Sequence, residues 1–351
     1  MFVGLSGGVD SSVSALLLKQ QGYDVIGVYM KNWSRDLPGM PCPWQDDYHD
    51  AKRVAVQLGI DFKMYDFEKD YQNKVVDYML TEFKAGRTPN PDIMCNQEVK
   101  FKLFLNTALE DGADYIATGH YAQIKSGKLL TAKDANKDQT YFLYRVTKKA
   151  LAKTIFPLGE LTKPEVRVLA KKHKLVTADK KESMGICFVG KVGIKEFLQQ
   201  FVKTKPGLII NQSGEEIGTH DGAIFYTIGQ RHGLDVGGGL PYYVTGKDMN
   251  SNEVYVTTDL QDEKLWSSEI KLTSAHWING EPKESMKLGV RTRHRAKLIP
   301  VKKLNPSASL RAGKSVEWVA ELGDDVRALT PGQSAVFYAN NICLGGGIVT
   351  S

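Results

Sequence analysis

The residues with the clearest chemistry lie near the start of the chain, in the run Ser6-Gly7-Gly8-Val9-Asp10-Ser11. The two glycines permit backbone angles that other residues avoid, so the chain can bend closely around a ligand. The N–H groups that open the following helix, together with its positive dipole end, then attract an anion. Serine hydroxyls add donors, and Asp10 offers a carboxylate that could orient a metal. The run therefore predicts a cradle for phosphate groups.

Two commoner nucleotide loops are excluded by the same residues. A Walker loop needs a Gly-Lys-Ser/Thr ending, yet the first lysine of the chain is Lys19, and the dinucleotide pattern G-x-G-x-x-G is also missing. The run instead resembles the signature of the PP-loop ATP pyrophosphatases, which split ATP between its α- and β-phosphates and leave an adenylated intermediate. An ordinary strand–turn–helix is the alternative, since glycine and serine are common turn residues.

Two of the four cysteines lie in segments where a reactive thiol could serve. Cys95 follows two prolines in the stiff polar segment 87–96, and we expect a helix to start just after it, near Gln97. The dipole of that helix would lower the pKa of the thiol. Cys187 lies in a glycine-flanked segment after a lysine-rich helix. For either residue, a buried structural cysteine is the alternative.

The other two cysteines carry weaker signals. Cys343 falls in an apolar strand pattern and is expected in a core, whereas Cys42 follows Pro41 in a loop and its role stays open. The chain contains no C-x-x-C pair, so neither a zinc site nor a disulfide framework is predicted.

Charge is concentrated in two clusters. The 351 residues carry a net charge of +6; eleven cations face three acids between Arg145 and Lys181, and six cations face no acid between Arg291 and Lys303. Such clusters suit the phosphates of nucleic acid, which supply most of its sequence-independent affinity for proteins. Solvated faces are the alternative. With 42% hydrophobic residues, no membrane-length apolar stretch and no leader pattern, the sequence predicts a cytoplasmic protein without a membrane partner.

Strand and helix signals alternate through the first third of the chain. We expect strands over residues 2–5, 24–30, 62–67 and 115–118, and helices over 9–17, 48–58, 71–84 and 99–109. This alternation predicts an α/β fold with a doubly wound parallel sheet, whose ligand crevice lies at the carboxyl ends of its strands. The cradle and Gly119-His120 would both lie at that edge. Further helices are expected over 163–173, capped by Thr162, and over 193–202.

Short β runs split by turns replace this pattern after Lys205-Pro206-Gly207. In the second of two β stretches we expect strands over 287–298, 315–321, 333–338 and 342–349. The sequence thus predicts three domains: an α/β domain with a helical extension over 1–204, a central β domain over 205–267 and a C-terminal β-barrel over 268–351.

A series of motifs makes the resemblance more specific. The cradle is followed by Asn-Pro-Asp-Ile-Met-Cys-Asn at 90–96, Thr-Gly-His-Tyr at 118–121, Lys-Asp-Gln-Thr-Tyr-Phe-Leu at 137–143 and Ser-Met-Gly-Ile-Cys-Phe-Val-Gly at 183–190. With Thr-Ile-Gly-Gln-Arg at 227–231 and Pro-Gly-Gln at 331–333, the series closely resembles the tRNA-specific 2-thiouridylases over nearly the whole chain.

The resemblance implies replacement of oxygen by sulfur at C2 of the wobble uridine in tRNAs for lysine, glutamate and glutamine. ATP would adenylate the C2 oxygen, because a uracil carbonyl oxygen is a poor leaving group. Sulfur would arrive as a persulfide on Cys187, from a cysteine desulfurase or a sulfur-relay protein. Cys95 would be the partner nucleophile, freeing sulfide or closing a disulfide with Cys187.

The resemblance also assigns binding residues. ATP would contact Gly4, Leu5, Ser6, Gly7, Gly8, Val9, Asp10, Ser11, Met30 and Gly119. Mg²⁺ would be carried on the ATP phosphates, and no resident metal site is expected in the protein. The target base would meet Asn90, Pro91 and Asp92, the last being a candidate catalytic acid or base. The tRNA, with its anticodon base flipped out, would be contacted by His120, Lys137, Asp138, Gln139, Arg293, His294 and Gln333. His294 stands where family members usually carry tyrosine, so its role stays open.

Two other functions remain open, and a third is set aside. An amide-forming PP-loop ligase for a small molecule would use the cradle but neither the motif cysteines nor the basic β segment. A non-catalytic RNA-binding protein with a redox disulfide would leave the cradle idle. A 4-thiouridine synthase would share the cradle and the persulfide chemistry, but would need additional N-terminal RNA-binding domains that the printed sequence does not contain.

Overall fold

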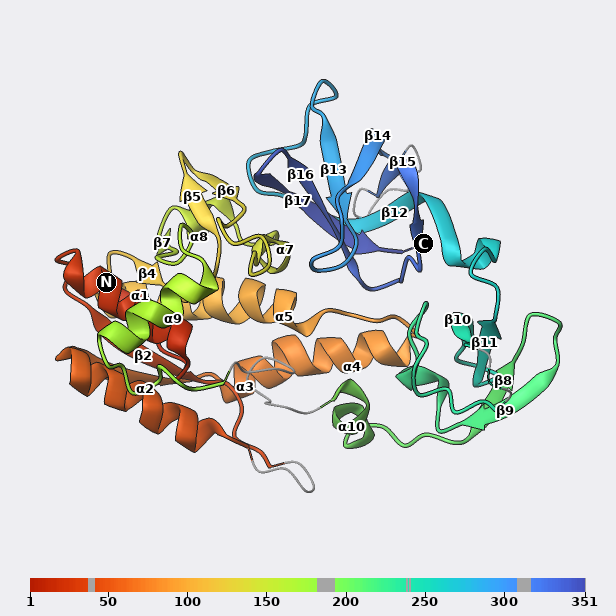
Figure 1. Ribbon diagram of the computed structural model, residues 1–351, viewed down its shortest axis with the longest axis horizontal. Helices are drawn as coiled ribbons and strands as arrows, with labels where there is room; N and C mark the ends of the chain where they lie inside the picture. Colours follow the sequence, from red (N-terminus) through yellow and green to blue (C-terminus); the bar gives the residue numbers. More distant parts are fainter. Residues whose placement is uncertain (37–41, 182–192, 238, 240, 308–316, 351) are drawn as a thin grey trace.

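A five-stranded parallel sheet forms the centre of the N-terminal domain (Figure 1). The computed structural model describes residues 1–36, 42–181, 193–237, 239, 241–307 and 317–350. The strand order is β3–β2–β1–β4–β7, with every pairing parallel; the strands are Asp61–Asp66, Ile26–Lys31, Phe2–Gly4, Ile116–Ala117 and Thr154–Ile155. The order reverses beside β1, which is where such sheets bind ligands. The predicted α/β fold is confirmed.

Helices cover both faces of this sheet because strand side chains alternate between the faces. Val3, Leu5 and Ala117 pack against one layer, formed by helices α1 (Val9–Gln20), α2 (Trp44–Leu58) and α9 (Lys163–Lys172). Phe2, Val28 and Ile116 pack on the opposite side. The helices of that side are α3 (Glu68–Tyr71), η1 (Gln72–Val76), α4 (Asp77–Lys84), α5 (Pro91–Met94), η2 (Cys95–Phe104) and α6 (Leu105–Glu110).

The helix expected to begin near Gln97 begins six residues earlier. α5, the π-helical η2 and α6 follow one another without a break from Pro91 to Glu110. Asn90 caps this helix: its side-chain oxygen accepts from the N–H groups of Asp92 and Ile93 at 3.1 and 3.3 Å. Asparagine at the cap followed by proline at the first helical position is a strong start signal, and it outweighs the polar character that had suggested a loop.

Smaller elements complete the N-terminal part of the chain. The hairpin of β5 (Gln123–Lys125) and β6 (Lys128–Leu130) is followed by α7 (Thr140–Leu143) and α8 (Lys148–Leu151). Helix α10 (Ile194–Gln199) leads to the middle domain. Strand β6 pairs with β17 of the C-terminal barrel, at Leu129 with Cys343 and Leu130 with Ile342. The N-terminal domain therefore shares a sheet with the barrel.

The middle domain is a four-stranded mixed sheet in the order β10–β11–β8–β9. Its strands are Tyr243–Asp248, Glu253–Thr257, Gly207–Ile210 and Glu216–His220, and the short helix η3 (Ala223–Phe225) follows β9. Ile209, Val244, Val254 and Val256 form its core.

The C-terminal domain is a closed six-stranded barrel, as predicted. Its strands pair in the order β12–β15–β14–β13–β16–β17, and β17 pairs back to β12; they are Trp266–Trp277, Trp318–Arg327, Ile299–Pro306, Leu288–Arg291, Ser334–Ala339 and Ile342–Val349. The single strand expected over 287–298 is wrong. β13 ends at Arg291, and Arg295, with φ of 62°, lies in a turn that the alternating pattern did not reveal.

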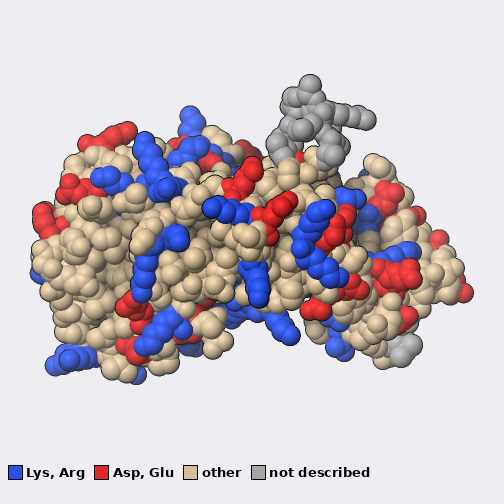
Figure 2. Space-filling view, turned by 90° about the horizontal axis from the view of Figure 1, so that it is seen from above, with Lys and Arg blue, Asp and Glu red and all other residues tan. Residues whose placement is uncertain are grey.

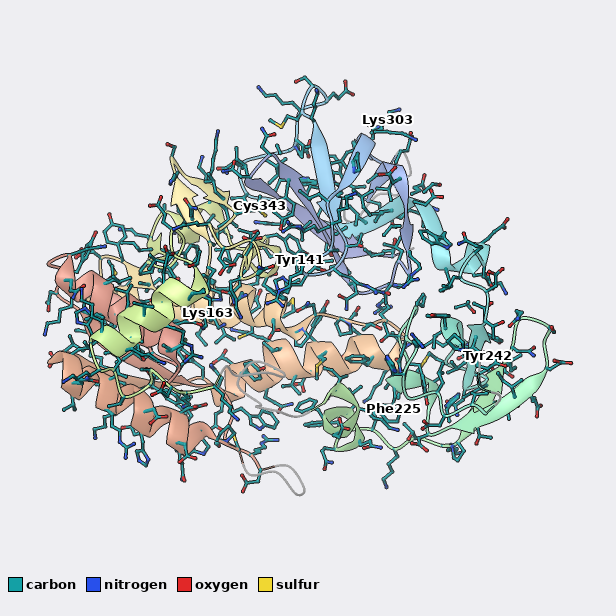
Figure 3. All side chains as sticks on the ribbon, viewed as in Figure 1. Tyr141, Lys163, Phe225, Tyr242, Lys303 and Cys343 are labelled. Carbon is teal, nitrogen blue, oxygen red and sulfur yellow. The ribbon has the colours of Figure 1, made fainter. Side chains whose placement is uncertain are left out.

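A buried ion pair joins the N-terminal domain to the barrel. Asp138, 3% exposed, accepts from Nη1 of Arg291 at 3.1 Å, from Oγ1 of Thr140 at 2.8 Å and from the N–H of Ala132 at 3.0 Å. Nearby, the hydroxyl of Tyr141 donates to the carbonyl of Ser334 at 2.9 Å (Figure 3). Polar groups from both domains are thus satisfied only when the domains are docked.

Replacing Asp138 with alanine should lower the free energy of unfolding by about 3 kcal/mol, because Arg291 then lacks its partner in a mostly buried site. Denaturant titration followed by tryptophan fluorescence measures the change. Glu160→Gln, which removes an exposed ion pair with Lys125, is the control and should leave the midpoint unchanged. Equal midpoints for the two variants would contradict the prediction.

Candidate nucleotide and tRNA site

The cradle is the turn between β1 and α1, and its backbone is held by its own serines. Oγ of Ser11 accepts from the N–H of Ser6 at 3.1 Å and donates to the carbonyl of Gly8 at 3.1 Å. Gly8 is the N-cap of α1 and has no side chain to occupy the first N–H groups of the helix. These N–H groups have no partner within the helix and face the turn, as anion binding requires.

Close backbone contacts explain two of the predicted glycines. Gly7 has φ of 71°, and a Cβ added there would lie 2.4 Å from the carbonyl oxygen of Asp47 in α2. A Cβ on Gly119 would lie 2.8 Å from the backbone nitrogen of Ser11. The loop after β4 is therefore packed directly on the cradle, as the sheet edge predicted.

The other nucleotide-site residues lie around the same turn. A Cβ on Gly4 would lie 3.0 Å from Cε of Met30, the penultimate residue of β2. Leu5 and Val9 are buried below the cradle, at 1% and 4% exposure. The structure thus brings together the residues predicted to bind ATP, in a form that leaves backbone donors rather than side chains at the centre.

A buried lysine that the sequence reasoning missed completes the cradle. Nζ of Lys163, the first residue of α9, lies 2.7 and 2.8 Å from the two carboxylate oxygens of Asp10 (Figure 3). The hydroxyl of Tyr121 donates to the same carboxylate at 2.9 Å. Lys163 is only 9% exposed, so its charge is directed at the cradle rather than at solvent. Only the fold brings Lys163 to Asp10, because 152 intervening residues separate them.

A second lysine anchors the chain that leads toward Cys187. Nζ of Lys180 lies 2.7 Å from Asp47 and 2.6 Å from Asp50, both in α2. The carbonyl of Asp47 lies beside Gly7, so the described chain reaches the cradle's edge just before residue 182. Cys187 itself lies outside the described residues.

Cys95 lies in a different setting from the one expected. It is the fifth residue of the continuous helix that starts at Pro91, and it is fully buried. The predicted helix start just after Cys95 is therefore wrong. Because the dipole effect falls off within the first turn, the helix start does not support a reactive thiol at Cys95. Asp92 and Asn90 lie one turn closer to the helix start and are partly exposed. The segment therefore presents Asn90 to Asp92 at the surface, with the thiol beneath.

The other two described cysteines are buried or partly buried. Cys343 is fully buried in β17, as predicted, and burial raises the pKa of its thiol. Cys42 is partly buried, with Sγ 3.7 Å from the carbonyl of Trp33, and burial raises the pKa of this thiol as well. Neither environment favours a thiolate. Among the residues that the structure describes, no group of three or more His, Cys, Asp or Glu side chains could hold a metal.

Two of the predicted tRNA contacts are buried. His120 is 7% exposed; its Nδ1 lies 2.8 Å from Oγ1 of Thr118, and its ring packs against those of Phe101 and Phe156. Asp138 belongs to the ion pair between the domains. In this conformation neither side chain can reach a tRNA, so a contact by either one would require rearrangement.

The other predicted tRNA contacts lie along the junction of the domains. Gln139 accepts from the N–H of Tyr121 at 2.9 Å, and the partly exposed Lys137 lies two residues before it. His294 packs on Phe142, with ring centroids 4.5 Å apart. An aromatic contact is thus kept although the family's usual tyrosine is absent. Burial, and then the charge of Arg295, lower the pKa of His294 below 6.5.

The surface charge is mixed on the face shown in Figure 2. Lys and Arg side chains are interspersed there with Asp and Glu rather than gathered in one patch. Several cations of the two clusters are engaged in ion pairs, among them Arg291 with Asp138 and Lys163 with Asp10. A helix long and apolar enough to cross a membrane is not found in the described part of the chain.

Comparison with known proteins agrees with this architecture. Residues 1–191 match the family model described as the tRNA methyl transferase HUP domain, 195–258 the tRNA methyl transferase PRC-barrel domain and 267–349 the aminomethyltransferase beta-barrel domain. The tRNA-specific 2-thiouridylase MnmA of Geobacillus thermodenitrificans is 47% identical over 353 residues, covering 99% of this chain and 93% of the relative. The chain belongs to the tRNA-specific 2-thiouridylase family. The Bacillus subtilis 2-thiouridylase is 46% identical, with 99% and 94% covered.

A solved structure matches far more weakly than these 2-thiouridylases. NMN synthetase from Francisella tularensis is 17% identical and covers 52% of this chain and 65% of its own, with a TM-score of 0.34. A likeness at that level supports no argument about the site.

Lys163→Ala should weaken ATP binding by about 10- to 100-fold, because it removes a charged donor at the cradle and leaves the Asp10 carboxylate facing the phosphates. Isothermal titration with ATP and Mg²⁺ measures the dissociation constant. Lys171→Ala, an exposed position on the same helix, is the matched control. An unchanged affinity in a folded Lys163→Ala protein would exclude this role.

Acidification should destabilise the protein through His120. Burial, and then the charge of Lys100, hold the pKa of His120 well below 6.5 in the folded state. As the pH falls below about 6.5, His120 therefore binds a proton in the unfolded chain but not in the folded one, and the free energy of unfolding decreases. Melting temperatures between about pH 7 and 5 should fall less steeply for His120→Gln than for wild type, with the exposed His49→Gln as control. An equal dependence of melting temperature on pH in His120→Gln and wild type would contradict this role of His120.

Proposed function

We propose that this protein is a tRNA 2-thiouridylase that uses ATP to activate the C2 oxygen of the wobble uridine and then replaces it with sulfur. The substrates would be tRNAs for lysine, glutamate and glutamine, and the products 2-thiouridine, AMP and pyrophosphate. In class it would be a tRNA-uridine 2-sulfurtransferase. The observation that carries the proposal is the full-length identity of 46–47% to relatives named 2-thiouridylases.

The matching family models are named after methyl transferases, so the choice of thiolation needs its own support. It comes from the cradle, whose backbone donors suit ATP phosphates, and from the two cysteines in motifs of the thiouridylase type. A methyl transfer would give neither feature a role. The proposal therefore rests on residues as well as on names.

Adenylation would take place at the cradle. The N–H groups at the start of α1 would bind the phosphates, and Lys163 would offset negative charge as pyrophosphate leaves. The C2 oxygen of the uridine would attack the α-phosphorus, the bond to the β-phosphate oxygen would break, and an O-adenylated base would form. Asp92 would lie beside the base as the acid or base for proton movement.

Mg²⁺ would be carried mainly by the ATP phosphates. Both oxygens of Asp10, the acidic side chain of the cradle, accept from Lys163, so a cation there would have to compete with the lysine. When bound, the ion would neutralise phosphate charge.

Sulfur transfer would follow at the two cysteines. The terminal sulfur of a persulfide on Cys187 would attack C2, and AMP would leave with the former carbonyl oxygen. Attack of the Cys95 thiolate on Sγ of Cys187 would then cleave the S–S bond, leaving sulfur on the base and a Cys95–Cys187 disulfide. Alternatively, Cys95 would first free sulfide, which would attack C2. Both routes require Cys95 to become accessible, and the disulfide must be reduced by a thiol before the next cycle.

The persulfide would come from a cysteine desulfurase or a sulfur-relay protein, and the reaction would take place in the cytoplasm. Both are proposals from the family resemblance. A small-molecule amide ligase is disfavoured because it would leave no role for Cys95 or Cys187. Full ATP–pyrophosphate exchange without tRNA would instead support such a ligase.

Cys187→Ser should abolish 2-thiouridine formation while leaving ATP and tRNA binding unchanged, since only the persulfide carrier is lost. Purified glutamate tRNA is incubated with ATP and a persulfide source, and nucleosides are quantified by mass spectrometry. Cys95→Ser should lower the yield by at least about 100-fold. Cys42→Ser is the control thiol and should retain activity. Formation of 2-thiouridine by Cys187→Ser would refute the proposed function.

A further inference from the structure

The turn between α4 and α5 lies where all three domains meet (Figure 1). Every polar group of Thr88 in this turn is engaged by a β domain. Its N–H donates to the carbonyl of Pro331 at 2.8 Å, and its carbonyl accepts from Nε2 of Gln333 at 2.7 Å, both from the barrel. Its hydroxyl lies 3.4 Å from the hydroxyl of Thr227 in the middle domain. The N-terminal domain is thus tied to both β domains through one residue.

Glycines on both sides allow this close approach. Gly332 of the barrel has φ of 90°, and a Cβ there would lie 2.8 Å from the backbone nitrogen of Thr88. Gly86 has φ of 78°, and a Cβ there would lie 2.8 Å from Cγ of Met249 in the middle domain. A side chain at Gly332 would collide with the backbone of Thr88, and one at Gly86 would displace the side chain of Met249. The close contact therefore depends on the residue types at both positions.

The two β domains also hold each other at this point. Nη2 of Arg293 in the barrel donates to the carbonyl of Ala328 at 2.9 Å and to that of Ile228 in the middle domain at 3.3 Å. A Cβ on Gly229 would lie 2.3 Å from Cβ of Ala328. The junction is therefore a three-way contact rather than two separate ones.

Thr88 leads directly into the proposed target-base segment, Asn90 to Asp92. Pro89 is buried and, like Pro91, has a fixed φ, while Asn90 is bound as the cap of α5. Five residues with so few free torsions transmit a displacement rather than absorb it. The position of Thr88 therefore sets the position of Asn90 and Asp92.

We propose that Thr88 is a positioning residue, through which the middle domain and the barrel together place the target-base segment for reaction. The inference rests on the proposed function, because it assumes that a base is presented to Asn90 and Asp92. It gives the middle domain a role in catalysis, namely to fix one side of this junction. It also predicts that a loose junction slows the chemical step while binding persists.

The test compares Thr88→Val with Thr88→Ser and with Thr81→Val, an exposed threonine on α4 whose hydroxyl bonds within its own helix. Valine keeps the shape of Thr88 and removes its hydroxyl. The kcat of tRNA thiolation should fall about tenfold in Thr88→Val, with the KM for tRNA and the affinity for ATP within about twofold of wild type. Thr88→Ser should recover most of the rate, and Thr81→Val should match wild type.

A double-mutant cycle separates positioning from general weakening. Thr227→Val should give the same loss as Thr88→Val, and the double variant should lose no more than either one. Gly332→Ala should lower kcat by at least as much, because its Cβ prevents docking on Thr88. Three results would overturn the inference: a wild-type kcat in Thr88→Val, a higher KM for tRNA with kcat unchanged, or losses of kcat that add in the double variant. Absence of 2-thiouridine with the wild-type protein would instead overturn the proposed function.

Discussion

The whole site depends on backbone segments that approach more closely than side chains would allow. The cradle turn touches α2 at Gly7 and the loop after β4 at Gly119, each at a distance where a Cβ would collide. These contacts bring three chain segments together at the reversal of strand order, and they leave the first N–H groups of α1 facing the turn. Lys163 then supplies the positive charge that glycines cannot. The strand order of the sheet sets the position of the site, and the glycines leave space there for an anion.

The sequence was sufficient for the features that follow from local pattern. Alternating apolar runs predicted the parallel sheet, and the cradle and Gly119 were placed correctly at one edge because parallel strands end together. Contacts between residues far apart in the sequence could not be predicted in the same way. The pairs Lys163 with Asp10 and Thr88 with Thr227 produce no repeating pattern in the sequence. The helix start at Pro91 was a different failure, because Asn90-Pro91 was interpreted as a stiff loop although it is also a capping signal. The turn at Arg295 was missed because a basic run showed no break.

Several residues predicted to bind tRNA also hold the domains together. Asp138 pairs with Arg291, Gln333 donates to the carbonyl of Thr88, and Arg293 donates to the carbonyl of Ile228 in the middle domain. A side chain that bonds across a domain boundary is engaged within the protein, so in this conformation its hydrogen-bonding groups are not all free for a tRNA. These interdomain bonds form only when the domains are docked, which is not true of the contacts of an exposed basic patch.

The pairing of β6 with β17 has a consequence for how the chain can be divided. A barrel cut out of the protein would present the backbone donors and acceptors at the start of β17 without their partner strand, and the N-terminal fragment would present the unpaired edge of its hairpin. Exposed strand edges of this kind recruit other chains and aggregate. The N-terminal domain and the barrel are therefore not modules that can be exchanged at their linkers. A barrel transferred to another protein has to include the β5–β6 hairpin that pairs with β17.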